Sequence, residues 1–99
     1  MLLRERETPE GLLVSVCDEA CLGETYENGD ITLEVEAEFY GGDGAVDAGP
    51  DAVVDALQRA SVANIVGAES VAVAGDAGLV DEETVLEVET TKHAQLMWL

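Results

Sequence analysis

The chain has 99 residues, 47% of them hydrophobic, and its 22 acidic residues face four basic ones for a formal net charge of −18. This length suits one domain over residues 1–99, and the hydrophobic fraction excludes a disordered chain. No apolar run approaches the roughly 20 residues that span a bilayer, and the first ten residues lack the apolar core of a signal peptide. We therefore expect a cytoplasmic protein that does not associate with membranes.

The acidic residues are scattered along the chain, whereas the basic ones are only Arg4, Arg6, Arg59 and Lys92. Such a charge destabilises a compact state in dilute salt through self-repulsion. In ~1 M salt the screening length falls to about 3 Å and most of this repulsion disappears. The pattern predicts adaptation to high salt. An acidic patch that binds a basic partner is the alternative, and the two are compatible.

The first part of the chain is predicted to form a hairpin. Residues 1–7 are short and mixed, residues 8–11 (Thr-Pro-Glu-Gly) supply turn chemistry, and residues 12–17 are an apolar, β-branched strand. Residues 18–25 are expected to form a loop or a single helical turn.

A second hairpin is predicted at Asn28-Gly29, the strongest short hairpin signal in the chain. Residues 31–36 then alternate apolar and polar side chains, which predicts a strand with one buried face and one wet face. Residues 39–44 contain three glycines in four positions and are expected to form a mobile or tightly turning loop.

The following stretch is predicted to be helical. Pro50 suits the first turn of a helix, and apolar residues recur on one side of the chain after it. We expect this apolar helical face to continue through residues 62–66, after a capping residue at Ser61, and to stop at Gly67.

The last part is predicted to contain one more helix and two strands. The helix covers residues 69–77 and ends at Gly78, where Leu79 is placed for the hydrophobic contact of a Schellman cap. Strands are expected at residues 85–88 and 95–99. The order of elements predicts an α+β fold, a two-layer sandwich in which two or three helices cover one face of a mainly antiparallel sheet.

The cysteines and the only histidine do not form a recognisable catalytic or metal-binding motif. Cys17 and Cys21 are spaced C-x3-C, but zinc needs about four ligands and the chain has no second ligand pair. We expect free thiols, no metal site and no cofactor. His93 acts as a general base only with a nucleophile and an orienting acid close in space, which the sequence does not show. We therefore assign no catalytic residue.

The glycine-rich segments also lack the groups that nucleotide or RNA binding requires. Residues 41–44 (Gly-Gly-Asp-Gly) have no Walker lysine, and residues 75–78 (Gly-Asp-Ala-Gly) carry an aspartate where an RNA-binding loop of this spacing meets phosphate. Four scattered cations cannot form a basic stripe. In molar salt, however, the attraction between basic residues and phosphate is suppressed in any protein. The lack of a basic stripe therefore counts less than usual, and direct nucleic-acid binding stays open.

Six segments spread over almost the whole chain form a recognisable set: Leu12–Asp18, Leu22–Tyr26, Glu38–Gly42, Val62–Gly67, Gly78–Asp81 and His93–Gln95. In this order they resemble the archaeal "domain of unknown function 424" family. Cys21 and Lys92 depart from the family's usual pattern. The resemblance implies a small two-layer α/β sandwich with no established activity, in a translation or RNA context.

Seven residues are candidates for a partner-binding role because they are polar groups or glycines that core packing does not require. If the segment at 39–42 lies near the last strand, four of them, Tyr40, Asn64, His93 and Gln95, line one surface. The full set is Tyr40, Gly41, Gly42, Asn64, Gly67, His93 and Gln95.

These observations favour a non-catalytic interaction module, associated with translation or RNA processing, that docks on a ribonucleoprotein or a translation factor. One alternative is a small enzyme that uses His93 with a carboxylate. Another is a structural subunit that forms a homodimer through an exposed sheet edge or the apolar segment 96–99.

Overall fold

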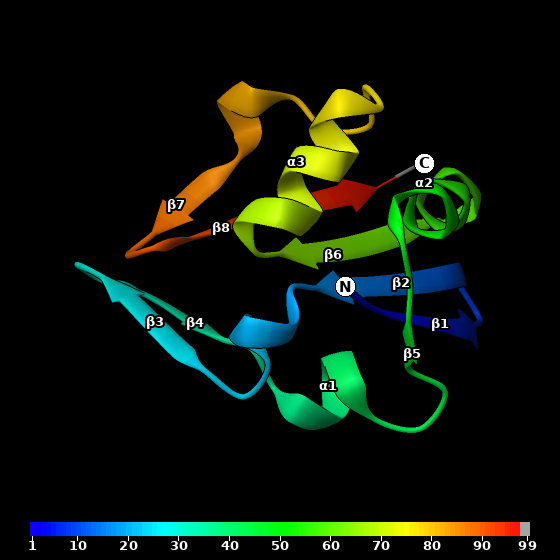
Figure 1. Ribbon diagram of the computed structural model, residues 1–99, viewed down its shortest axis with the longest axis horizontal. Helices are drawn as coiled ribbons and strands as arrows, with labels where there is room; N and C mark the ends of the chain where they lie inside the picture. Colours follow the sequence, from blue (N-terminus) through cyan, green and yellow to red (C-terminus); the bar gives the residue numbers. More distant parts are fainter. Residues whose placement is uncertain (98–99) are drawn as a thin grey trace.

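A six-stranded sheet forms the centre of the computed structural model, which describes residues 1–97 (Figure 1). Its strands are β1 (Leu2–Thr8), β2 (Gly11–Cys17), β5 (Val46–Asp47), β6 (Val62–Val66), β7 (Leu86–Val88) and β8 (Thr91–Met97). They lie in the order β5-β1-β2-β6-β8-β7, and every neighbouring pair is antiparallel except β2 and β6, which are parallel. A separate antiparallel hairpin pairs β3 (Thr25–Asn28) with β4 (Ile31–Glu34).

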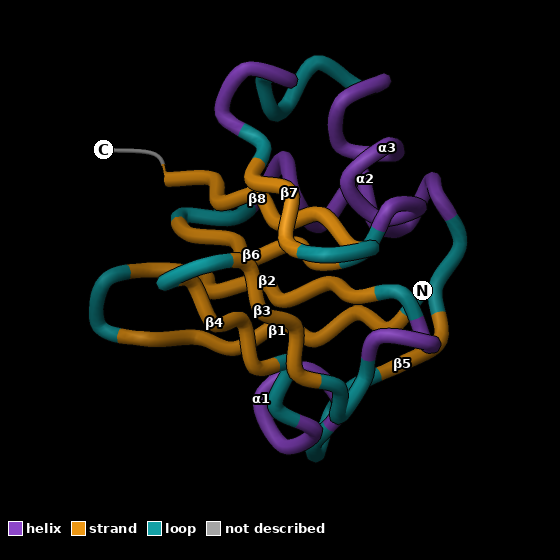
Figure 2. Tube along the Cα trace, turned by 90° about the vertical axis from the view of Figure 1, so that its left-hand side faces the viewer, coloured by secondary structure: helices purple, strands orange, loops and turns teal. Residues whose placement is uncertain are grey.

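Helices lie on both sides of this sheet. The helices are α1 (Ala37–Gly41), α2 (Pro50–Arg59) and α3 (Ala68–Asp76), and single 3-10 turns occur at Glu19–Cys21 and Glu82–Thr84. Figure 2 shows α2 and α3 on one side of the sheet, and α1 and the β3–β4 hairpin away from them. The predicted α+β class, with a mainly antiparallel sheet and two helices on one face, is confirmed. None of the helices in residues 1–97 is long and apolar enough to cross a membrane.

The face of the sheet that α2 and α3 cover, here the helix face, carries the larger apolar core. Val14 and Ile65 point from the central strands toward Val53 and Leu57 of α2, and all four are fully buried. Side chains on a strand alternate between faces, so these residues define the helix face at every second position. Burying each such side chain contributes about 1.5–3 kcal/mol.

The opposite face, here the second face, carries a smaller apolar cluster. Cys17 and Val66, at the ends of β2 and β6, pack with Val35 and Tyr40 from the segments around β4 and α1. The hairpin is also tied to the edge of the sheet, because the backbone N–H of Glu27 donates to the Glu89 carboxylate at 2.6 Å. Apolar contacts therefore cover only one end of the second face.

Residues 62–66 form a central strand, so the predicted helical continuation through them is wrong. A short apolar run of five residues does not distinguish a strand from a buried helix by its periodicity. Here β6 forms hydrogen bonds with β2 on one side and β8 on the other. These long-range partners decide the structure of a segment rich in β-branched residues.

Two further expectations in the first half of the chain need correction. Residues 37–41 form the short helix α1, where a loop was expected over residues 39–44. The strand predicted over residues 31–36 ends at Glu34, and Ile31 is still 39% exposed, so the expected buried face is built mainly by Val35 beyond the strand. The glycines terminate α1 rather than preventing it.

Most of the remaining elements follow the predictions, but strand β5 lies in a stretch for which no strand was predicted. Both hairpins form, and α2 begins at Pro50. The Schellman cap after α3 is complete, since Gly78 N–H donates to the Gly75 carbonyl and Leu79 N–H to the Ala74 carbonyl, both at 2.9 Å. Gly78 adopts φ +74°, which suits glycine, and Leu79 packs on the core. The last strand begins at Thr91, earlier than predicted, and residues 98–99 of that prediction lie outside the described residues.

Candidate binding face

A row of four polar side chains crosses the second face, one on each of four neighbouring strands. Arg4 of β1 pairs with Ser15 of β2, Ser15 with Asn64 of β6, and Asn64 with Gln95 of β8. Neighbouring strands of a sheet lie about 4.7–4.9 Å apart, whether they run parallel or antiparallel. The sheet register therefore places Arg4, Ser15, Asn64 and Gln95 side by side, and we refer to them as the polar row.

The polar row becomes more accessible from β2 toward β8. Ser15 is fully buried, Asn64 is half-buried and Gln95 is exposed. The Ser15 hydroxyl makes no hydrogen bond with any residue in 1–97. An unpaired buried hydroxyl costs about 1–3 kcal/mol, so apolar packing alone does not account for this row. Asn64 and Gln95 place two amides, which both donate and accept hydrogen bonds, at its open end.

A hollow of about 230 Å³ lies beside the polar row. Its lining combines Asn64 with the aromatic residues Phe39 and Tyr40 of α1 and the carboxylates of Glu34 and Glu36. The two rings meet edge to face, with centroids 4.9 Å apart. Burial, assisted by Cys17 and Glu36, raises the pKa of Tyr40 to about 12, so its phenol stays neutral. The hollow thus offers a neutral aromatic wall, an amide and two carboxylates.

His93 lies on the same face, two residues before Gln95. Its neighbours across the sheet are the apolar residues Val66 of β6 and Leu86 of β7. Burial lowers the pKa of the His93 imidazole, which favours the neutral form. No carboxylate among residues 1–97 accepts a hydrogen bond from it. The described part of the chain therefore places no orienting acid on His93.

A second hollow, of about 490 Å³, shares Glu36 and Phe39 with the first. Arg4 donates from Nη1 to the Glu38 carbonyl and, at 3.1 Å, to the Phe39 carbonyl. The guanidinium carbon of Arg6 lies 4.6 Å from the centroid of the Phe39 ring, a cation–π contact. We call this the arginine hollow; its lining is Arg4, Arg6, Glu36, Glu38, Phe39, Gly42 and Asp43.

The predicted glycines have local structural explanations. Gly67 adopts φ +110°, and a Cβ there would lie 2.2 Å from Cγ of Asp18. Asp18 uses that space to cap α3, accepting hydrogen bonds from Ser70 N–H at 2.8 Å and from the Ser70 hydroxyl at 2.7 Å. A Cβ on Gly42 would lie 2.4 Å from the Glu38 carbonyl oxygen, and one on Gly41 would lie 3.0 Å from the Leu22 side chain. These glycines shape the surroundings of the face.

The structure brings together four of the seven predicted residues. Asn64 and Gln95 are paired, His93 lies on the same face, and Tyr40 shares a hollow with Asn64. Gly67, in contrast, belongs to the cap of α3. Sequence reasoning missed Ser15 and the arginine pair. A serine inside the apolar run 12–17 and two arginines at alternate positions of one strand were the available signals.

The cysteines contribute packing at this end of the face. Cys17 and Cys21 are free and buried, and Cys21 Sγ lies 3.5 Å from the Thr91 hydroxyl. Burial, with Cys21 and Asp18 nearby, raises the pKa of the Cys17 thiol to about 11, so it is protonated and unreactive at neutral pH. Within residues 1–97 no group of three or more histidine, cysteine or carboxylate side chains is placed to hold a metal ion.

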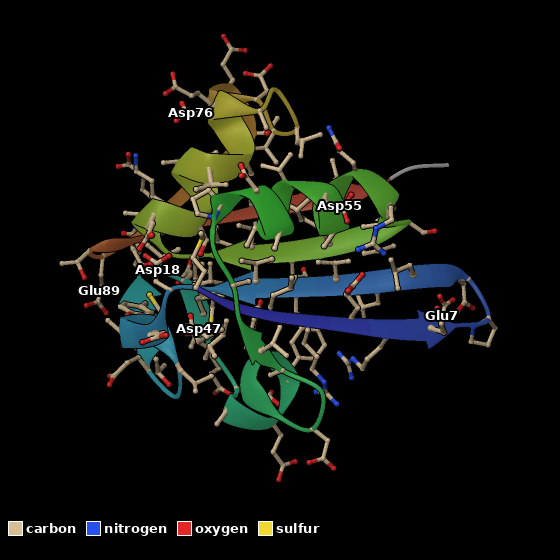
Figure 3. All side chains as sticks on the ribbon, turned by 45° about the vertical axis from the view of Figure 1, so that its right-hand side comes forward. Glu7, Asp18, Asp47, Asp55, Asp76 and Glu89 are labelled. Atoms are coloured by element: carbon tan, nitrogen blue, oxygen red, sulfur yellow. The ribbon has the colours of Figure 1, made fainter. Side chains whose placement is uncertain are left out.

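Acidic side chains project from many parts of the molecule in Figure 3, although β2, β6 and β8 carry none, and only three ion pairs occur among the described residues. The labelled ones lie on β1, β5, α2, α3 and the connections between elements, so they are spread over the molecule. The labelled side chains are Glu7, Asp18, Asp47, Asp55, Asp76 and Glu89.

A family model described as "Protein of unknown function (DUF424)" matches residues 5–99 of the chain. The fold is similar to a crystal structure of an uncharacterized conserved protein from Methanopyrus kandleri, with a TM-score of 0.72 and 26% sequence identity over 99% of this chain and 93% of that one. No curated protein matches the sequence.

Proposed function

The chain belongs to the DUF424 family of proteins of unknown function, and from that premise we propose that it is a non-catalytic binding module whose docking surface is the second face. The proposal rests on the polar row. Asn64 and Gln95 are neighbours at its open end, and neither side chain is bonded to another residue in the described part of the chain. The amide groups of these two side chains are therefore available to form hydrogen bonds with a partner.

The chemistry around the polar row favours docking over catalysis. The first hollow offers aromatic rings, an amide and carboxylates, a combination that packs against side chains and accepts hydrogen bonds. The described residues place no nucleophile beside a base and an orienting acid, the arrangement that covalent catalysis uses. His93, whose neighbours across the strands are apolar, extends the surface rather than forming a separate site.

The partner we propose is a ribonucleoprotein or a translation factor. The carboxylates of Glu34 and Glu36 at the rim favour a basic protein surface of such an assembly over bare nucleic acid. Hydrogen bonds to Asn64 and Gln95 are screened less by salt than surface ion pairs are. This surface therefore suits docking in the high salt that the composition predicts.

An affinity pull-down from a lysate of the source organism, with and without nuclease, tests this proposal. We expect ribosomal or translation proteins to be captured by the wild type and lost with the double variant Asn64→Ala/Gln95→Ala. Gln58→Ala removes an exposed amide from α2 on the opposite side, and we expect it to retain capture. Capture of neither RNA nor translation components, or equal capture by both variants, contradicts the proposal.

A homodimer is a second candidate, favoured by exposed apolar side chains along the edge and end of the sheet. Leu86 of edge strand β7 is 39% exposed and Met97 of β8 is 56% exposed. Gel filtration in ~2 M potassium chloride separates the two states directly. A dimer that Leu86→Glu dissociates supports this candidate, and a monomer rejects it.

A further inference from the structure

The arginine hollow concentrates half of the basic side chains of a strongly acidic chain. Of the four basic residues, Arg59 bonds to Glu5 at 2.7 Å and to Asp55 at 3.1 Å. Arg4 and Arg6, by contrast, form no ion pair with any carboxylate in residues 1–97. Lys92 also lacks an ion pair among these residues, but it is exposed, whereas Arg4 and Arg6 are neighbours on one face of β1 and are partly buried.

The unused donors of Arg6 are arranged on one edge of its guanidinium. Nε and Nη2 are both buried, and neither forms a hydrogen bond with the described residues. These two N–H groups form the edge that binds a carboxylate with two parallel hydrogen bonds. The Phe39 ring covers one of the two flat faces of the group, with its centroid 4.6 Å from the guanidinium carbon. The Nε–Nη2 edge holds the buried donors that have no partner, so it is the edge that is available to a ligand oxygen pair.

Arg4 also lines the hollow, and the backbone of α1 fixes its position. Its Nη1 is fixed by the carbonyl groups of Glu38 and Phe39, while its Nε is buried without a hydrogen-bond partner. Gly42 keeps the space beside it open, since a Cβ at this position would lie 3.1 Å from Arg4 Nη1. The hollow of about 490 Å³ falls within the size range of small-ligand sites.

The remaining lining decides which anion fits. Glu36, Glu38 and Asp43 also line the hollow, and they repel a ligand group in proportion to its negative charge. A phosphate group carries close to two negative charges at neutral pH and a carboxylate carries one. The arginine edge can bind a planar carboxylate or a tetrahedral phosphate. The acidic lining repels the phosphate more strongly, so it favours the carboxylate.

From this geometry we infer that the arginine hollow is a binding site for a carboxylate group, held bidentately by Arg6 and supported by Arg4. The carboxylate belongs either to a small organic acid or to the C-terminus of a peptide. Binding requires the Arg6 side chain to turn its Nε–Nη2 edge toward the hollow. This site is separate from the amides of the polar row, so it is tested independently of the docking proposal.

Nuclear magnetic resonance of the arginine Nε–H groups tests the inference directly. Potassium chloride is replaced stepwise by potassium acetate at constant ionic strength, and the signals of Arg4, Arg6 and Arg59 are followed. We expect a saturable shift of Arg6 and a smaller one of Arg4. Arg59, which is already bonded to Glu5 and Asp55, serves as the internal control and should not move.

Two matched variants separate the contribution of the bidentate guanidinium edge of Arg6 from that of its positive charge. Arg6→Lys keeps the charge but lacks the bidentate edge, and we expect about tenfold weaker acetate binding, read from the Gly42 backbone amide. Arg59→Lys should bind acetate as the wild type does. N-acetylglycylglycine should also bind while its C-terminal amide should not, and tighter binding than acetate identifies a peptide C-terminus as the source.

Three results overturn the inference. Equal, non-saturating shifts of all three arginines show an adventitious ion only. Tighter binding of inorganic phosphate than of acetate rejects a carboxylate site. Unchanged acetate binding by Arg6→Lys shows that Arg6 has only a structural role over Phe39.

Discussion

The two faces of the central sheet are formed by the same strands but differ in what they bury. On the helix face, Val14, Ile65 and Leu57 are fully buried against one another. On the second face, the same strands β2 and β6 present Ser15 and Asn64, and the strand beside them presents an exposed Gln95. The helix face therefore has a complete explanation in packing, and the second face does not.

This difference separates stability from function within one sheet. A substitution on the helix face changes the folding free energy through cavities and lost apolar burial. Polar residues that packing does not require are better candidates for binding. The comparison predicts that variants of the helix face lose stability, whereas variants of the polar row lose binding.

The largest effect is expected for the core of the helix face. Leu57 is fully buried, so Leu57→Ala should lower the free energy of unfolding by about 2–5 kcal/mol through the cavity it leaves. Met97, which is 56% exposed at the end of β8, is the matched apolar control, and Met97→Ala should cost less than about 0.5 kcal/mol. Urea unfolding in high salt measures both. Similar losses in the two variants would remove the contrast between core and surface.

The next effect concerns salt and the whole surface. With a net charge of −18, raising potassium chloride from ~0.1 M to ~2 M should stabilise the fold by screening repulsion. We expect a gain on the order of 2 kcal/mol, which raises the melting temperature by roughly 10 °C for a chain of this size. Equal melting temperatures would reject salt adaptation, and the acidic surface would then need a partner to explain it.

A smaller effect is expected at the N-terminal cap of α3. Asp18 follows β2 and accepts the backbone N–H groups of Glu69 and Ser70 at the start of α3. Asp18→Ala should cost about 1–2 kcal/mol, the usual value of a helix N-cap. Glu19→Ala alters an exposed neighbour outside the cap and should leave thermal melting unchanged. A neutral Asp18→Ala would show that Gly67 is not kept open for this cap.

A weaker, pH-dependent effect is expected at His93. Burial lowers its pKa in the folded state below the ordinary value of 6.5, so the unfolded chain binds more protons as the pH falls through that range. Stability should therefore decline from pH 7.5 to 5.5, and His93→Gln should decline less. The effect is smaller than that of Asp18 because His93 is only half-buried. Identical declines in the two proteins would assign the pH dependence to other groups.

The sequence predicts local features well and long-range pairings poorly. The Schellman cap at Gly78 depends on a few adjacent residues, and the structure confirms it. The identity of β6 depends on β2 and β8, which lie far from it in the chain. Because residues 62–66 were expected to be helical, no cross-strand neighbour of Asn64 was predicted.

The candidate site was predictable as a set of residues but not as an arrangement. Asn64, His93 and Gln95 stand out as polar residues in apolar surroundings. The polar row arises only when a parallel and an antiparallel register align Ser15, Asn64 and Gln95. The arginine hollow similarly depends on the position of α1 below β1, and the sequence assigned that segment to a loop.

The smallest effect on stability is expected for the polar row, and it provides the most direct test of the division between the two faces. The double variant Asn64→Ala/Gln95→Ala should change the free energy of unfolding by no more than about 0.5 kcal/mol, because Asn64 and Gln95 are not fully buried. Its melting temperature should therefore stay close to that of the wild type. Capture of translation components should nevertheless fall to background, while Gln58→Ala keeps both stability and capture. A double variant that melts normally and still captures its partners would contradict the assignment of the second face as the binding surface.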